Sequence, residues 1–414
     1  MIEAGLTFAH YRPKRSRCLS CADIRMHSDP VFYTIFVIFT GAAVLATLAL
    51  FARQALLVAY IVLGVLLGPW GLGLVTDPQL INGISQIGII FLLFLLGLNL
   101  PLEKLYSLVG ESLRVTGISS ALFGALGIGV GWLFGFNLTE SLVIGAAMMF
   151  SSTIIGLKLL PTTILHHQHT GEIIISVLLL QDLIAIVILM LLQIQGGTEI
   201  GMVQYVLLAI SLPLLFLIAY LLEKYVLIKL LQRFDTIQEY IFLLTIGWCL
   251  GMAELAGLMG LSHEIGAFIA GVALATNPIA LFIAESLKPL RDFFLVIFFF
   301  SLGAGFDLGA LQSVLLPALV LAAAAMLLKP LVFGYLLRHS GEAPARSHEV
   351  GVRLGQISEF SLLIAVLALE LSVIGREASY LIQAATILTF MASSYFIVMK
   401  YPTPIALSDR LRRD

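Results

Sequence analysis

The sequence predicts an all-α, polytopic membrane protein with about 13 transmembrane helices, on the strength of its composition, its hydropathy and the length of its apolar runs. Of its 414 residues, 60% are hydrophobic and 12% are charged, and the mean hydropathy is +1.04. A soluble chain of this length carries about twice that share of charged residues. The solvent around most of the chain is therefore a lipid bilayer.

Apolar stretches of about 20 residues, which is the length that crosses ~30 Å of hydrocarbon, fill nearly everything after Asp29. The expected spans are 31–51, 55–75, 80–100, 113–136, 138–160, 172–195, 203–227, 238–260, 262–283, 290–310, 314–338, 347–371 and 378–400. The domain map that follows has a polar N-terminal tail (1–29), one transmembrane domain (30–400) and a short cytoplasmic tail (401–414).

Lysine and arginine in the short connecting loops predict the orientation, because such residues gather on the cytoplasmic side. With thirteen spans and a cytoplasmic C-terminus, nearly all of these loop residues fall inside and only Arg376 falls outside. The basic tail breaks the pattern. Since Met26 stands just before the first span, we expect residues 1–25 to be a mis-assigned extension. If translation starts at Met1, twelve spans with both ends inside is the alternative.

Several classes of function have no support in the sequence. No basic run is long enough to follow a nucleic-acid backbone, so we expect no nucleic-acid partner. Cys18 and Cys21 form a CxxC pair without the further ligands of a structural zinc site, so we expect no metal. No HExxH, GxSxG or GxGxxG motif favours an enzyme or a bound cofactor. The glycines of GALGIGVGWLFG, among them Gly127 and Gly131, have instead the GxxxG spacing that lets helices approach closely.

Asp182 is the residue that points most directly to function. It lies in the middle of a predicted span, SVLLLQDLIAIVILMLL, with Gln181 as its only adjacent polar residue. An ionised carboxylate there costs at least ~2.5 kcal/mol, so such residues usually serve a purpose. Burial disfavours the charged form of a carboxylate. A carboxyl group in this position can hold either a proton or a monovalent cation, but not both, which is the requirement for coupled exchange. A carboxylate that a buried partner merely satisfies is the alternative.

Two other predicted spans are interrupted by polar residues, one in each half of the chain. The first carries Ser151, Ser152 and Thr153 in its middle, and the second carries Gly355, Gln356, Ser358 and Glu359. Transporters built from inverted repeats place broken helices at corresponding positions, where freed backbone groups line the ion site. We therefore expect inverted repeats and two crossing discontinuous helices. The alternative is that the serines bond back to their own helix.

Three more charged residues in the apolar segments require partners or water. Arg353 and Glu359 belong to the same predicted span, and Lys329 precedes Pro330, which is expected to kink the span before it. One hypothesis pairs Glu359 with Lys329. We treat all three charged residues as candidates that support the ion site.

With these residues in view, the sequence resembles the Kef-type potassium/proton antiporters of the monovalent cation:proton antiporter superfamily over nearly all of residues 30–400. The strings that carry the resemblance are AYIVLGVLLGPWGLGL at 59–74, IGIIFLLFLLGLNL at 87–100, SSTIIGLKLL at 151–160, LLLQDLIAI at 178–186, GAFIAGVALA at 266–275 and GQISEFSLL at 355–363.

The resemblance implies that Gln181 and Asp182 mark the ion site. Because glutamine stands where electrogenic relatives have a second acid, it implies one titrating carboxylate and electroneutral exchange. It also implies a bacterial inner-membrane homodimer, in which a six-helix core moves against a dimerisation domain. Potassium is the favoured cation and sodium the alternative.

The chain departs from Kef systems in ending before a cytoplasmic nucleotide-binding domain. We therefore expect a freestanding exchanger or one controlled by a separate regulatory subunit. A potassium channel is a competing interpretation, although the sequence has no TVGYG-like filter.

Overall fold

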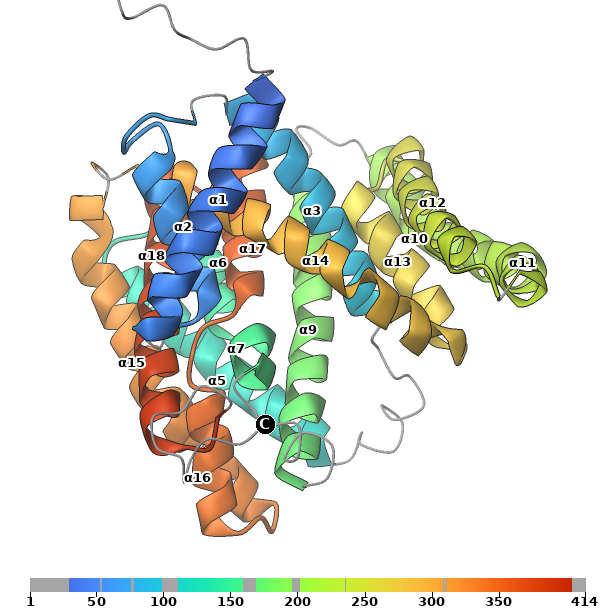
Figure 1. Ribbon diagram of the computed structural model, residues 1–414. Coiled ribbons are helices and arrows are strands. Elements are labelled where there is room, and N and C mark those ends of the chain that lie inside the picture. Colours follow the sequence, from blue (N-terminus) through green and yellow to red (C-terminus); the bar gives the residue numbers. More distant parts are fainter. Residues whose placement is uncertain are drawn as a thin grey trace, which may run out of the picture.

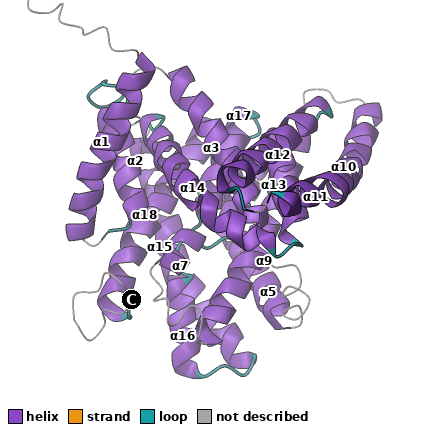
Figure 2. Cartoon of the chain, turned by 45° about the vertical axis from the view of Figure 1, so that its right-hand side comes forward, coloured by secondary structure: helices purple, strands orange, loops and turns teal. Residues whose placement is uncertain are grey.

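The computed structural model describes residues 30–52, 54–75, 78–98, 111–158, 169–195, 202–234, 236–307, 309 and 311–403. Within those residues every regular element is a helix (Figures 1 and 2). The predicted class of all-α membrane protein is confirmed. The basic N-terminal tail with its CxxC pair and the end of the C-terminal tail lie outside the described residues.

The described helices follow the apolar runs along the chain. The first half contains α1 (Pro30–Phe51), α2 (Leu56–Leu67), α3 (Pro78–Leu98), α5 (Glu111–Leu133), α6 (Leu138–Met148), α7 (Thr153–Lys158) and α9 (His169–Gln195). The second half contains α10 (Met202–Leu222), the π-helical turn η1 (Glu223–Leu227), α11 (Ile228–Arg233), α12 (Gln238–Leu258), α13 (His263–Ala275), α14 (Ile279–Ala304), α15 (Leu311–His339), α16 (Pro344–Arg353), α17 (Glu359–Glu370) and α18 (Arg376–Lys400).

Six described helices are long and apolar enough to cross a membrane unaided, namely α1, α5, α9, α12, α15 and α18. Shorter apolar helices, such as α2, α6 and α13, fall below that length. Two of the predicted spans, 138–160 and 347–371, are each divided into two helices. Such divisions leave fewer uninterrupted helices than predicted spans, and the count of thirteen and the inverted repeats stay predictions.

The first division separates α6 from α7. α6 ends at Met148 and α7 begins at Thr153. The hydroxyl of Ser152 accepts a hydrogen bond from the backbone N–H of Ile155 at 3.1 Å. A serine in that position caps the start of a helix and stabilises a new helical turn.

The second division has the same chemistry. α16 ends at Arg353 and α17 begins at Glu359. Ser358 caps α17, because its hydroxyl accepts a hydrogen bond from the N–H of Phe360 at 3.1 Å. Ser152 and Ser358 thus cap the helix that follows each of them, which differs from the back-bonding of a serine to the preceding turn of a continuous helix.

α9 occupies the middle of the molecule and contacts α5, α7, α16 and α17 (Figure 1). α1, α2 and α14 pack together, and α10, α11 and α12 lie on the side away from α1 in both views (Figures 1 and 2). The helix that carries Asp182 is therefore in contact with both broken helices.

Glycine allows close contact between α5 and α6. A Cβ added to Gly127 would lie 2.7 Å from the Cα of Gly145, and one added to Gly131 would lie 2.8 Å from the Oγ of Ser141. Real Cβ atoms do not approach that closely, so the prediction that this GxxxG pair serves packing is confirmed.

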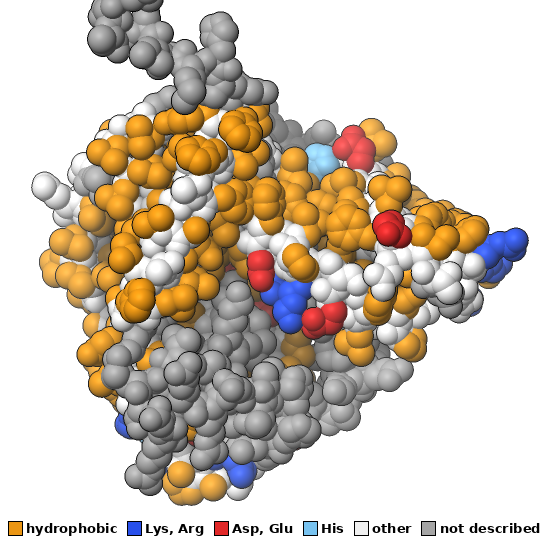
Figure 3. All heavy atoms as spheres, in the orientation of Figure 1, with side chains coloured by type: hydrophobic (Ala, Val, Ile, Leu, Met, Phe, Trp, Pro, Cys, Tyr) orange, Lys and Arg blue, Asp and Glu red, His pale blue; other side chains and the backbone are white. Residues whose placement is uncertain are grey.

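Hydrophobic side chains cover much of the upper part of the face in Figure 3, as expected for a surface in contact with lipid.

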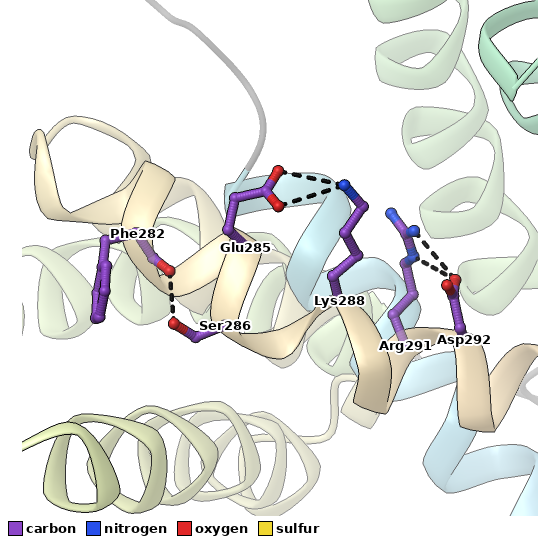
Figure 4. A network of polar contacts seen from close by, with 6 residues as sticks. All are labelled: Phe282, Glu285, Ser286, Lys288, Arg291 and Asp292. Atoms are coloured by element: carbon purple, nitrogen blue, oxygen red, sulfur yellow. Dashed lines mark hydrogen bonds and ion pairs between the residues drawn. The ribbon is translucent and has the colours of Figure 1, made fainter. Parts of the chain in front are cut away.

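The helix α14 carries exposed charges and begins earlier than the predicted span 290–310. Its exposed Lys288 donates to Glu285 at 3.3 and 3.4 Å, and Arg291 pairs with Asp292 at 3.0 Å (Figure 4). These charges lower the local hydropathy, which is why the sequence places the start of this helix too late.

Candidate functional site

Asp182 lies near the middle of α9 and is only 2% exposed. The hydroxyl of Thr153, the first residue of α7, lies 3.2 Å from Oδ2 and 3.3 Å from Oδ1 of the carboxylate. Within the described part of the chain, Thr153 is the only hydrogen-bond donor to Asp182. No lysine or arginine of the described residues forms an ion pair with it. The carboxylate therefore keeps acceptor capacity for a further ligand.

Gln181, the neighbour of Asp182, binds the backbone of the first break. Its Oε1 accepts a hydrogen bond from the N–H of Ser151 at 3.0 Å, and its Nε2 donates to the carbonyl of Met149 at 3.1 Å. The ends of helices leave such backbone groups without helical partners. One neutral side chain satisfies two of them and fixes the break beside Asp182.

The two broken segments, far apart in the sequence, are hydrogen-bonded to each other. The hydroxyl of Ser151 donates to the carbonyl of Leu354 at 2.7 Å. The Nε2 of Gln356 donates to the carbonyl of Ser152 at 3.3 Å. The polar residues Ser151, Ser152 and Gln356 of the two breaks are all 0% exposed, and these bonds bring the two breaks together. The predicted hydroxyl and amide residues of the two breaks, among them Ser151, Ser152 and Gln356, therefore do lie together.

Lys329, on α15, joins the two breaks from a third direction. Its ammonium group donates to the carbonyl of Phe150 at 2.6 Å and to the carbonyl of Gln356 at 3.1 Å, and it lies 5.2 Å from the ring centre of Phe123. Both carbonyls follow the C-terminal end of a half-helix, where the helix dipole is negative and a cation is favourable. The hypothesis that Lys329 pairs with Glu359 is wrong, because these contacts direct the ammonium group to backbone carbonyls instead.

Glu359 and Arg353 take different places. Glu359 is the first residue of α17, and its carboxylate interacts electrostatically with that of Asp182. Arg353 ends α16, and its guanidinium donates to Glu349 and to the carbonyl of Pro402. Glu359 thus belongs to the neighbourhood of the carboxylate, and Arg353 does not.

Residues of α18 also support the second break, and the sequence reasoning missed them. The hydroxyl of Ser393 donates to Oε1 of Gln356 at 3.1 Å, and the hydroxyl of Thr389 accepts from the N–H of Ile357 at 3.1 Å. The only sequence signal was a set of hydroxyl residues inside the last apolar run. Hydroxyls of this kind are common in membrane helices, so the pattern alone does not single them out.

A cleft opens between α3, α9, α13 and α17. Its volume is about 510 Å³ including the open space at its mouth. Polar residues Gln86, Glu264 and Glu370 contribute to its lining, and Ile186 and Leu363 are among its apolar residues. Ile186 follows Asp182 by four residues and Leu363 follows Glu359 by four, which is about one helical turn in each case. The cleft therefore extends along the helices that carry these two carboxylates.

Comparison with known proteins identifies the family. A family model described as "Sodium/hydrogen exchanger, transmembrane" matches residues 35–400. The chain is 29% identical over 398 residues to K(+) efflux antiporter 4 of Arabidopsis thaliana, covering 93% of this chain and 66% of that protein. It is 27% identical over 354 residues to iron transporter MagA of Paramagnetospirillum magneticum, covering 83% of this chain and 80% of that protein. A solved structure of the sodium proton antiporter MjNhaP1 from Methanocaldococcus jannaschii matches with a TM-score of 0.65 and 17% identity, covering 89% of this chain and 95% of that one.

The names of these three proteins refer to three different cations, so they do not determine which cation this chain carries. The chain also spans slightly less than two thirds of the plant relative, at 66% of its length. The match to a potassium efflux antiporter confirms the resemblance to Kef-type membrane domains. Because the family model covers nearly all of the predicted transmembrane domain, the chain belongs to the sodium/hydrogen exchanger family of transmembrane cation/proton antiporters.

Proposed function

We propose that the protein exchanges a monovalent cation for a proton through the carboxyl group of Asp182. The observation that carries the proposal is that this carboxylate is 2% exposed and has one hydroxyl, that of Thr153, as its hydrogen-bond donor among the described residues. A purely structural acid at that depth would need several donors or an ion-pair partner, because an unpaired buried charge is strongly disfavoured. A proton or a cation would supply the missing partner.

Competition for the one carboxyl group couples the two ions in this proposal. A protonated Asp182 has no charge with which to attract a cation, and a cation bound to the carboxylate excludes the proton. Gln181 adds no charge, and both ends of its amide are engaged by the backbone of the first break. One cation would therefore replace one proton, and the exchange is electroneutral.

Potassium is the proposed cation, supported by the likeness to a potassium efflux antiporter. Sodium is the second candidate, supported by the likeness to a structure named as a sodium proton antiporter. The two ions differ in radius and in the cost of dehydration, so ion selectivity depends on ligand geometry that the family does not fix.

The proposed setting is a bacterial inner membrane, with the C-terminus in the cytoplasm and two copies of the chain forming a homodimer. A separate regulatory subunit is a further proposed partner. In this orientation the cleft beside Ile186 lies on the outer side of Asp182, and alternating access would open and close it. No catalytic role is proposed for any residue.

The test is proton movement into proteoliposomes, measured with a trapped pH dye while the membrane voltage is clamped. Addition of potassium or sodium to the wild type should drive proton movement, and Asp182→Asn should abolish it, because an amide neither binds a proton nor carries the charge. Asp307→Asn is a matched control, since Asp307 lies in a loop and caps the N–H of Gly309 at 2.8 Å. Proton movement retained in Asp182→Asn would remove this residue from the mechanism. Cation flux without proton movement would favour a channel.

A further inference from the structure

Arg353 occupies a place that the proposed exchange mechanism does not use. It is the last residue of α16, and its side chain is 0% exposed. Its Nε donates to Oε1 of Glu349 at 3.0 Å, and its Nη2 donates to the carbonyl of Pro402 at 3.0 Å. The centre of the guanidinium lies 5.4 Å from the ring centre of Tyr401. The side chain thus binds the segment 401–403, which follows α18.

The aromatic partner suits a cation. Tyr401 lies beyond the end of α18, where burial, together with the nearby carboxylate of Glu349, raises the pKa of its phenol above the ordinary value. The phenol therefore stays neutral under physiological conditions, and its ring face attracts the guanidinium. A second contact joins α16 to the last residue of α18, because Nζ of Lys400 lies 3.5 Å from Nε2 of His348.

On its other side, α16 rests on α15 without a gap. A Cβ added to Gly351 would lie 2.6 Å from the carbonyl oxygen of Pro330. α16 is consequently held between α15 and the segment 401–403. A helix of ten residues held on both sides has little freedom to shift along its axis.

The residue after Arg353 already belongs to the ion site. Leu354 accepts the hydrogen bond from Ser151 at 2.7 Å, and Gln356 follows with its contacts to Ser152 and Lys329. A movement of the end of α16 therefore reaches the second break directly, and through Ser151 and Ser152 it reaches the first break beside Asp182.

Burying a guanidinium costs free energy unless its donors are well paired. Its planar arrangement of N–H groups fixes the direction of its partners more strictly than the rotatable ammonium group of a lysine does. We propose that Arg353 is a positioning residue that ties the segment 401–403 to the break at 354–358 and thereby sets the cation affinity at Asp182. This inference rests on the proposed function for its transport readout only.

The first test is hydrogen–deuterium exchange in the full-length protein. Arg353→Gln should speed amide exchange across 354–358, including at Ile357, whose N–H is held by Thr389 at 3.1 Å. The matched control is Arg346→Gln, which removes the 2.7 Å ion pair with Glu342 near the other end of the same helix and should leave that exchange unchanged. If Arg353→Gln and the control give the same exchange at 354–358, the positioning role is overturned.

The second test uses the dye assay in proteoliposomes. Arg353→Gln should raise the cation concentration for half-maximal exchange by about tenfold while the rate at saturating cation changes by less than about threefold, the pattern of weakened binding rather than weakened turnover. Arg353→Lys keeps the charge but not the planar arrangement of donors and should lie between wild type and Arg353→Gln. It also serves as the variant to study if Arg353→Gln does not fold.

If an active Arg353→Gln or Arg353→Lys variant needed the same cation concentration for half-maximal exchange as the wild type, the inference would be contradicted. A wild-type protein that transports neither ion would contradict the proposed function instead. The hydrogen–deuterium exchange measured at residues 354–358 would still decide the role of Arg353.

Discussion

At the scale of single residues, the hydroxyl of Thr153 is the hydrogen-bond donor to Asp182 among the described residues. A hydroxyl that donates to a carboxylate stabilises its charged form. The distances of 3.2 and 3.3 Å to the two carboxylate oxygens leave it shared between them. Thr153 thus favours the charged form of Asp182, the form that would attract a cation in the proposed exchange.

We expect Thr153→Val, which keeps the shape and removes the hydroxyl, to let protons compete better. The cation concentration for half-maximal exchange should rise by about three- to tenfold, the equivalent of about 0.7–1.4 kcal/mol for one lost hydrogen bond. The rate should reach its maximum at a higher pH than in the wild type. The dye assay over a range of pH measures both effects. Thr153→Ser retains the hydroxyl and should behave like the wild type, and equal behaviour of Val and Ser would exclude the hydrogen bond as the cause.

At the scale of helices, the two breaks depend on one another. Gln181 satisfies the backbone of the first, α18 satisfies the second, and Lys329 binds a carbonyl of each. Unpaired backbone groups in a membrane interior are costly. The breaks therefore exist as a pair, and a change in their shared partners affects both.

Lys329→Met should lower the thermal stability of the detergent-solubilised protein. It leaves the carbonyls of Phe150 and Gln356 without this donor, and each unsatisfied carbonyl costs about 1–3 kcal/mol. Relief from burying the ammonium group offsets only part of this, because that group is already paired. Differential scanning fluorimetry should show a lower midpoint for Lys329→Met than for Lys288→Met, which alters an exposed pair on α14. Equal midpoints would contradict the bridging role of Lys329.

Gly351→Ala tests the contact between α16 and α15. The added methyl would lie 2.6 Å from the carbonyl oxygen of Pro330, which is backbone and cannot move aside. We expect a loss of about 1–3 kcal/mol from overpacking, with weaker cation binding because the second break moves with α16. Gly334→Ala is the control on α15, since its methyl would lie at an ordinary 3.8 Å from Ser347. The measurements are the thermal midpoint and the cation concentration for half-maximal exchange. Wild-type values of both in Gly351→Ala would contradict the tight fit between α16 and α15.

At the scale of the whole molecule, one shared carboxyl group predicts how exchange depends on pH and voltage. Where protons dominate the site, a drop of one pH unit should raise the cation concentration for half-maximal exchange by up to about tenfold, since the two ions compete for Asp182. Electroneutral exchange should not respond to an imposed potassium-diffusion potential when sodium is the transported ion. Rates that follow the potential would show that unequal numbers of cations and protons are exchanged.

The sequence by itself identified the membrane class, most helices and the most informative residues. Asp182 and the hydroxyl clusters stand out because a polar group in a 20-residue apolar run is costly and needs a reason. Periodicity and composition sufficed for this, since they are local properties of the chain. The start of α14 was misplaced because its i, i+3 ion pair compensates charges that hydropathy counts separately.

Only the tertiary structure decided which partner each polar residue meets. Nothing local distinguishes Glu359 from the carbonyls of Phe150 and Gln356 as the partner of Lys329, because the choice depends on how three helices are placed against one another. The same holds for Gln181, which binds a break 30 residues earlier in the chain, and for Arg353, which binds Pro402. Sequence determines where a charge is too costly to be accidental, whereas the packing of distant segments determines what that charge touches.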